Sequence, residues 1–376
     1  MKKILIISFS AIRSDPRVMR QLRLLEHDWD VTVAGYGDAP DARVHFIPIV
    51  KPGTPKLVKV WWALKLMAGA FQHYYWNQYH VQSALSQLRE HGADVAIAND
   101  LSALPLALRL AGGTPVLYDA HEYSPREQED QWVWRLLFAR YSDWTCRRYL
   151  RAASAMTTVC QGIADEYQRV YGVRVGVVHN APSRQALAPA PVAPGHIRMI
   201  HHGVASRVRH LEGMIDLMRH LDDRFSLDLM LVNVEPAYMA FLRERAERDP
   251  RIRFIAPVPM AEICQRINGY DVGLYLLKPS NFNDAHALPN KFFEFVQARL
   301  AVAIGPSAEM ARLVKAHGFG VVAESFEPED LARELQKLDA DRIRTLKQAA
   351  DRAAAVLCFE RDAQLLRAEV QRLAAT

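Results

Sequence analysis

The stretch ALPNKFFEFVQARLAVAIG, residues 287–305, contains one complete helix–strand unit of the chain. Pro289 opens a predicted helix whose phenylalanines face inward, and the run AVAIG that follows predicts a strand buried on both faces. Such strands belong to parallel sheets, which need helices on both faces. The stretch therefore predicts an α/β fold.

Apolar runs of the same kind recur on both sides of this stretch. In the first half they are KILIIS, DVTVAGY, ADVAIAND, TPVLYDAHE, SAMTTVC and RVGVVHN, and in the second half HIRMIHHG, FSLDLMLV, IRFIAP, YDVGLYLL and GFGVVAE. Helical segments separate them, the longest predicted over residues 131–151. This alternation predicts doubly wound sheets.

The segment 181–195 carries four prolines and interrupts the alternation, so it reads as a linker. We therefore expect two Rossmann-like domains with doubly wound parallel sheets, residues 1–180 and 196–342, facing each other across a cleft. A helical segment, residues 343–376, follows them.

Composition narrows the class of protein. The 376 residues suit two domains, and the net charge of +5 lacks the concentrated basic stripe of a nucleic-acid binder. Four cysteines without a CxxC motif indicate reduced thiols in a cytoplasmic protein, and no His/Cys cluster has metal-ligand spacing. No uncharged apolar run is long enough to span a membrane. The glycine motifs of nicotinamide enzymes and P-loop NTPases are also missing.

Ligands of parallel sheets bind beyond the carboxyl ends of the strands. In the second half these ends carry His202, Arg207, Arg209 and Lys291 beside predicted helix starts, which bind phosphate through free N–H groups. Glu294, one turn after Lys291, can accept two ribose hydroxyls, so the pair predicts a nucleoside diphosphate site. The alternative is an i,i+3 ion pair on a solvated surface.

Together these pieces resemble the GT-B glycosyltransferases that use nucleotide-sugars, a group with many bacterial polysaccharide enzymes. The resemblance covers nearly the whole chain and rests on the order and spacing of SDPRVMRQLRLLEHDWDVTVAGY, VLYDAHE, VVHNAPS, HHGVASRVRHLEGMIDLM and ALPNKFFEFVQARLAVAIG. It implies an acceptor site in the first domain and a sugar donor, most simply a UDP-sugar, held by the second. It also implies that the terminal helix packs back on the first domain.

The resemblance also implies roles for single residues. Arg209 and Lys291 would hold the donor diphosphate and Glu294 the ribose, while Gly203 lets the phosphates approach the backbone and His121 approaches the transferred sugar. The remaining assignments are His202, Arg207, His286 and Asn290 to the donor site, and Asp15 and Arg17 to the acceptor. Many relatives have a glutamate where this chain has His286, and a glycine pair after the first strand is missing.

Glycosyl transfer needs charge stabilised on the leaving diphosphate, and an inverting enzyme also needs a base for the acceptor hydroxyl. Candidate catalytic groups at strand ends are Asp100, Asp119, His121 and Glu122. Asp100 and Asp119 have alternative roles as a helix cap and a turn residue. We expect retention of configuration, with neither a metal nor another cofactor.

Between Asp41 and Glu90 the chain has no acidic residue but four lysines, two arginines and, over residues 61–80, seven aromatic side chains. Aromatic and basic residues together are typical of a surface at lipid headgroups. We expect peripheral attachment to the inner face of the cell membrane and a glycan or polyprenyl-linked acceptor; a packing helix or dimer interface is the alternative.

The sequence therefore predicts a glycosyltransferase of bacterial surface polysaccharide synthesis. Two other functions fit the same fold. One is a nucleotide-sugar 2-epimerase, for which the lipid-facing segment has no use, and the other is a non-catalytic partner subunit, in which the phosphate-binding cations would not be retained.

Overall fold

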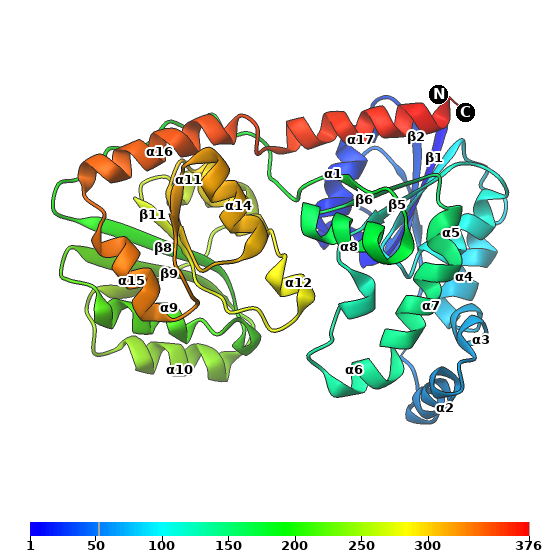
Figure 1. Cartoon of the computed structure of the whole chain (residues 1–376). Helices are drawn as coiled ribbons and strands as arrows, with labels where there is room; N and C mark the ends of the chain where they lie inside the picture. The colour runs from blue at the N-terminus through cyan, green and yellow to red at the C-terminus, as the bar shows by residue number, and fades with distance from the viewer. Residues whose placement is uncertain (52, 376) are drawn as a thin grey trace. The chain divides into compact units, whose positions relative to one another are not determined.

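The computed structural model describes residues 1–51 and 53–375 and divides into two compact units (Figure 1). Unit 1 comprises Met1–His179, the short segment Asn281–Asn283 and the C-terminal residues from Asp362 onward. Unit 2 comprises Asn180–Ser280 and Asp284–Arg361. Thr376, the last residue of the predicted C-terminal segment, lies outside the described residues.

Unit 1 is built on a parallel sheet of seven strands in the order β3-β2-β1-β4-β5-β6-β7. The central strands β4 and β5 are buried along their whole length, as Val/Ile/Leu-rich strands covered on both faces must be. The strands are β1 (Lys3–Ala11), β2 (Asp30–Tyr36), β3 (His45–Pro48), β4 (Val95–Asn99), β5 (Val116–Ala120), β6 (Ala155–Thr158) and β7 (Gly176–Val177).

The α-helices of unit 1 are α1 (Pro16–Leu25), α2 (Lys56–Met67), α3 (Phe71–Trp76), α4 (Tyr79–Leu88), α5 (Leu104–Ala111), α6 (Trp132–Leu137), α7 (Ala139–Tyr149) and α8 (Gln161–Tyr171). The helical stretch predicted over residues 131–151 is present but is divided into two helices. Phe138 ends α6 and precedes α7, and a 3₁₀ turn, Leu150–Ala152, follows α7. No proline or glycine marks this break in the sequence.

Unit 2 has a parallel sheet of six strands in the order β10-β9-β8-β11-β12-β13. Its strands are β8 (Ile197–Ala205), β9 (Phe225–Asn233), β10 (Ile252–Ile255), β11 (Val272–Tyr275), β12 (Ala301–Ile304) and β13 (Gly320–Val322). Its helices are α9 (Glu212–Leu217), α10 (Pro236–Ala246), α11 (Ile263–Ile267), α12 (Phe282–Ala285, of which only the end belongs to unit 2), α13 (Asn290–Gln297), α14 (Ala308–His317), α15 (Pro328–Gln336) and α16 (Ala340–Ala354). Residues 181–195 form neither helix nor strand.

The C-terminal region is divided between the units. Helix α16 belongs to unit 2, where Arg299 pairs with Asp351 at 2.6 Å and Lys347 donates to the carbonyl of Tyr270. Helix α17 (Phe359–Ala374) lies against unit 1 from Asp362 onward. The return to unit 1 thus begins later than residue 343, because the side chains of α16 are tied to unit 2.

Both sheets have the strand order of the Rossmann fold, and the prediction of two Rossmann-like parallel-sheet domains is confirmed. In each sheet the order reverses beside the first strand, between β1 and β4 in unit 1 and between β8 and β11 in unit 2. Ligands of such sheets bind outside the carboxyl ends of the strands at this point. Each switch point therefore locates one candidate ligand site, and we call these the half-sites of unit 1 and unit 2.

Candidate functional site

Lys291, in the first turn of α13, is the buried cation of the unit 2 half-site. Its side chain is 5% exposed, and Nζ lies 3.3 Å from Nε2 of His201 on β8. Nδ1 of His201 is 2.8 Å from the carbonyl of Leu274 and must donate to it, which leaves Nε2 to accept from Lys291. Burial, and then the charge of Arg209, lower the pKa of Lys291 to about 7, although Glu294 opposes the shift.

Glu294 is the buried anion one turn further along α13, at 7% exposure. Its Oε2 lies 3.4 Å from Nε2 of His202, in contact but without a hydrogen bond. Burial and the charge of Lys291 lower the pKa of His202 to about 3, so this ring is neutral at neutral pH. Because Lys291 and Glu294 are both buried, the alternative of an ion pair on a solvated surface is wrong.

Gly203, on β8, lies beside both Lys291 and a second cation, Arg209. A Cβ at this position would lie 2.6 Å from Nζ of Lys291 and 4.0 Å from Nη1 of Arg209, and the backbone has φ +136°. Only glycine fits both that conformation and that approach. Among the described residues Arg209 makes no ion pair, so the half-site combines two cations and one carboxylate beside an uncovered stretch of backbone.

Replacement of Gly203 by alanine is expected to displace the ammonium of Lys291 and to destabilise unit 2 by about 1–3 kcal/mol. Gly213, on α9, is the matched control, because a Cβ there meets nothing within 4 Å. Urea denaturation of both variants measures the effect. Equal stability of Gly203→Ala and Gly213→Ala would contradict the described packing.

Three other residues predicted for the donor site, Arg207, His286 and Asn290, have different surroundings. The guanidinium of Arg207 lies over the rings of Tyr238 and Phe241, at 5.2 and 6.0 Å from their centroids. His286 is half-buried in the segment before α13. Within the described chain, Oδ1 of Asn290 is buried without a hydrogen-bond partner, an arrangement that a ligand could satisfy.

At the unit 1 switch point the buried pair Arg17–Asp119 dominates. Arg17 donates from Nε and Nη2 to both carboxylate oxygens, at 2.7 and 2.6 Å, and from Nη1 to the carbonyl of Val178. Asp119 also accepts from Gln21 and Thr157. Burial raises the pKa of Asp119, but Arg17, with smaller contributions from His121 and Thr157, outweighs burial and lowers that pKa. Such a saturated carboxylate is a fixed charge, which does not fit the predicted role of a base.

Arg17 is likewise held by this pair at 6% exposure, with Nε, Nη1 and Nη2 each donating one hydrogen bond within unit 1. Asp15 caps α1, since its carboxylate accepts from the amides of Arg17 and Val18 and from the hydroxyl of Ser10. The acceptor roles of Asp15 and Arg17 stay predictions, and the carboxylate of Asp15 already stabilises the helix start.

His121 is the best-placed acid–base group of unit 1. Its Nδ1 lies 3.3 Å from Oδ2 of Asp100 and its Nε2 3.2 Å from Oδ1 of Asn99, and its side chain is 19% exposed. Asp100 has φ +64°, a conformation that non-glycine residues adopt rarely and often at functional sites. Glu122 is exposed. The structure thus joins His121 to Asp100.

Sequence reasoning missed His201, Tyr275, Gln21 and Asn99. His201 and Tyr275 surround the ammonium of Lys291, which lies 5.5 Å from the ring centroid of Tyr275. Gln21 and Asn99 are hydrogen-bonded to each other and link Asp119 to His121. Position was a signal for Asn99 and Tyr275, which are the last residues of β4 and β11, but not for His201, which lies in the middle of β8.

Comparison with known proteins gives a family match for part of the chain and a shared fold for nearly all of it. Residues 17–183 match the family model for Glycosyltransferase Family 4. No match was found among the curated proteins by sequence.

Solved structures similar to the chain include HepE from Anabaena, in complex with UDP and glucose, at 14% identity and a TM-score of 0.67; the match covers 99% of this chain and 100% of HepE. Sucrose-phosphate synthase from Thermosynechococcus elongatus matches at 14% identity and a TM-score of 0.72, covering 100% of both chains. WaaG, a glycosyltransferase involved in lipopolysaccharide biosynthesis, matches at 13% and 0.65, covering 96% of this chain and 98% of WaaG.

The family match covers part of the chain, and the solved structures show the same fold over nearly its whole length. The chain has the fold of these glycosyltransferase structures, and residues 17–183, in unit 1, are similar to Glycosyltransferase Family 4. The resemblance identified in the sequence is confirmed.

Proposed function

We propose that the chain transfers a sugar from a UDP-sugar to a glycan or lipid-linked acceptor. The observation that carries this proposal is the unit 2 half-site, where Lys291, Arg209 and Gly203 surround one point at the switch of the sheet. HepE, which has the same fold, was solved with UDP and with UDP-glucose. Structures of this fold therefore accommodate such a donor.

In the proposed reaction the bond between the anomeric carbon and the diphosphate oxygen breaks, and its electron pair leaves with the diphosphate. A new bond forms between that carbon and the acceptor oxygen, whose proton is released. Lys291 and Arg209 stabilise the negative charge that develops on the leaving group. The partly deprotonated Lys291 would become fully charged when the diphosphate binds, since an anion raises the pKa of a neighbouring lysine.

We assign the ribose to Glu294, whose carboxylate can accept hydrogen bonds from two vicinal hydroxyls. UDP is then expected to bind about tenfold more tightly than 2′-deoxy-UDP, because the deoxy analogue lacks one hydrogen bond to a charged acceptor. Calorimetric titration of both nucleotides measures this ratio. In Glu294→Gln the preference should shrink, and an unchanged preference in that variant would place the ribose elsewhere.

On the acceptor side, we propose His121 with Asp100 as the groups nearest the transferred sugar, supported by their contact at 3.3 Å. A retaining reaction needs no separate base, and the fixed charges of Asp119 and Arg17 offer none. Retention and independence of metal remain predictions. Product stereochemistry by NMR tests the first, and activity in EDTA tests the second.

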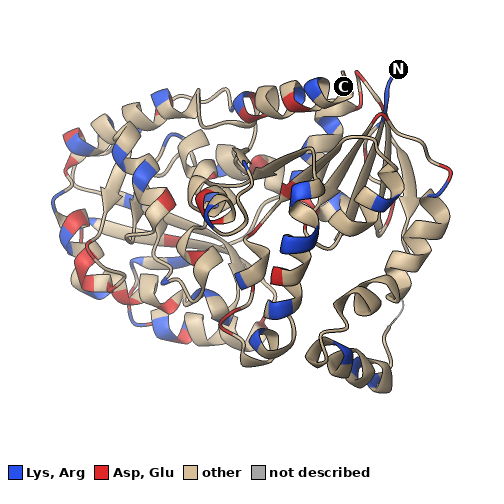
Figure 2. Ribbon diagram, turned by 45° about the vertical axis from the view of Figure 1, so that its right-hand side comes forward, with Lys and Arg blue, Asp and Glu red and all other residues tan. Residues whose placement is uncertain are grey.

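We also propose that the protein works at the inner face of the cell membrane in surface polysaccharide synthesis. In the described part of the chain no helix is long and apolar enough to cross a membrane. Helix α2 carries lysines and no acidic residue, visible as blue without red on the lowest helix at the right of Figure 2. Its exposed side chains include Leu57 (85%), Val60 and Trp61.

Membrane attachment has a direct test. The protein is expected to sediment with vesicles of anionic lipid at low salt, with about 1 kcal/mol contributed by each well-placed lysine. Leu57→Gln and Trp61→Gln should weaken binding, because the exposed apolar stripe of α2, formed by Leu57, Val60 and Trp61, can no longer enter the membrane–water interface. Binding that is independent of both the stripe and the salt would contradict membrane contact through α2.

The activity test supplies UDP-, GDP-, TDP- and CMP-sugars with lipid extract as acceptor and measures free nucleotide and sugar products. We expect UDP to be released from one donor only when acceptor is present. A 2-epimerase would instead change the sugar of the donor without acceptor. Absence of either reaction with every donor would favour the non-catalytic partner.

A further inference from the structure

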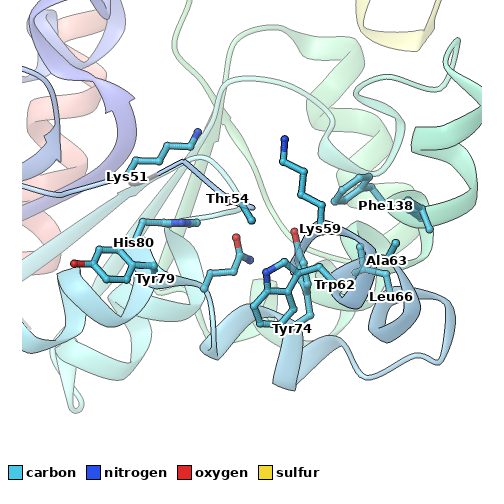
Figure 3. A pocket seen from close by; sticks show the side chains of 12 residues that line it. Lys51, Thr54, Lys59, Trp62, Ala63, Leu66, Tyr74, Tyr79, His80 and Phe138 are labelled. Carbon is cyan, nitrogen blue, oxygen red and sulfur yellow. The ribbon is translucent and has the colours of Figure 1, made fainter. Parts of the chain in front are cut away.

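Unit 1 contains a cavity of about 390 Å³ that shares no lining residue with the clusters around Asp119 and His121. Its size falls within the range of small-molecule sites. Its walls come from the segment before α2, from α2 itself, from α3, from the start of α4 and from the break between α6 and α7 (Figure 3).

Helix α2 has two apolar faces, and only one of them is covered. Lys59, Trp62, Ala63 and Leu66 are spaced i, i+3, i+4 and i+7 and line the cavity. The residues Leu57, Val60, Trp61 and Leu64 repeat this spacing on another face and are exposed. A helix that is apolar on an exposed face is typical of a surface that meets an apolar partner.

Aromatic rings form the apolar wall of the cavity. The centroids of Trp62 and Tyr74 lie 5.4 Å apart and those of Tyr74 and Phe138 6.5 Å apart, both edge-to-face. Leu66, also in the lining, is buried. Such rings offer a rigid surface to an aliphatic chain, and Phe138 reaches it because α6 ends there.

The charge on the other side of the cavity is positive. Figure 3 shows the ammonium ends of Lys51 and Lys59 pointing the same way, with Thr54 between them and the rings of Trp62 and Tyr74 below. His80 adds no charge, because burial and then Lys51 lower its pKa to about 4. None of the described lining residues is acidic.

We propose that this cavity binds a lipid phosphate, with the phosphate between Lys51 and Lys59 and the first part of its aliphatic chain against Trp62, Tyr74 and Phe138. Two cations without an acidic neighbour suit a phosphate, and the aromatic wall suits a chain that continues onto the exposed stripe of α2. The site would hold the lipid end of a membrane-borne substrate or a membrane lipid itself. It does not depend on the donor half-site of unit 2.

The test is calorimetric titration of the full chain with decyl phosphate below its critical micelle concentration. We expect saturable binding that weakens about tenfold in Lys51→Gln and in Lys59→Gln, the loss expected for one charged hydrogen bond. Both lysines are exposed, so these variants should fold. The matched control is Lys56→Gln, the same charge change on the same helix at a position outside the cavity lining, which should bind like the wild type.

Three outcomes would overturn the proposal. Inorganic phosphate binding as tightly as decyl phosphate would make it a simple anion site, and decanol binding as tightly would make it an apolar surface for a protein or a second copy of the chain. Equal losses of affinity for decyl phosphate in Lys56→Gln and Lys59→Gln would mean that the phosphate responds to the overall positive charge of the helix and not to the cavity. Titration of each variant with UDP separates this test from the donor site, since UDP binding should be unchanged.

Discussion

Replacement of Lys291 by methionine is expected to raise the stability of the protein at pH 6–7 by about 2 kcal/mol or more. Methionine keeps the length of the side chain and removes a charge that burial disfavours strongly enough to lower the pKa to about 7. His201 loses a hydrogen-bond donor, a smaller effect of about 1 kcal/mol. A buried cation that destabilises the fold is expected where a site must receive an anion.

The stability gained by Lys291→Met is expected to depend on pH. Above pH 7 folded Lys291 has lost its proton while unfolded Lys291 keeps it up to about pH 10.5, so wild-type stability rises with pH. The advantage of Lys291→Met should therefore shrink by about 1.4 kcal/mol for each pH unit above 7. Urea denaturation at pH 6, 7, 8 and 9 measures the difference.

Lys347 is the matched control within unit 2. It is also a buried lysine whose pKa burial lowers, to about 8, but it donates to the carbonyl of Tyr270 at 2.6 Å and faces Asp271 at 3.9 Å. Lys347→Met should destabilise the fold, because it leaves the carbonyl of Tyr270 without its donor and removes a cation beside the buried Asp271. If Lys291→Met is destabilising in the same way, Lys291 is a structural residue.

Replacement of Arg17 by methionine should destabilise unit 1 by about 3–5 kcal/mol, because it leaves the carboxylate of Asp119 buried without its cation. The reduced pKa of Asp119 means that the pair contributes stability above the unfolded pKa of about 3.9 and loses it as the pH falls. Urea denaturation at pH 7 measures the loss.

Arg169 provides a surface comparison, because its pair with Glu166 is 2.7 Å long but its side chain is 70% exposed. Arg169→Met should change the stability by less than about 1 kcal/mol. The double variant Arg17→Met with Asp119→Asn should recover part of the loss, since the uncompensated charge is gone. Equal effects of Arg17→Met and Arg169→Met would contradict the buried network.

The sequence predicted the sheets well because their strands are apolar without interruption. KILIIS and AVAIG have no polar alternation, so only burial on both faces suits them, and both lie in the strands β1 and β12. The break at Phe138 could not be predicted, since no local residue causes it. It depends on tertiary packing, which also places Phe138 in the wall of the cavity.

The sites show the same division between local and distant information. Lys291 and Glu294 share one helix face through their spacing, which the sequence reveals. The contact of Lys291 with His201 joins residues 90 positions apart, and that of Arg17 with Asp119 joins residues 102 apart. Strand ends indicated that these residues lie near a site, but only the folded chain distinguishes a cation held for a ligand from one paired with a carboxylate.

The measurement that tests the central claim most directly is calorimetric titration of UDP into the wild type, Lys291→Met and Lys347→Met at pH 6.5. We expect UDP to bind the wild type and Lys347→Met alike and to bind Lys291→Met at least about tenfold more weakly, because one charged hydrogen bond to the diphosphate is lost. Equal binding to all three proteins, or no binding to the wild type, would contradict a UDP-sugar site at Lys291.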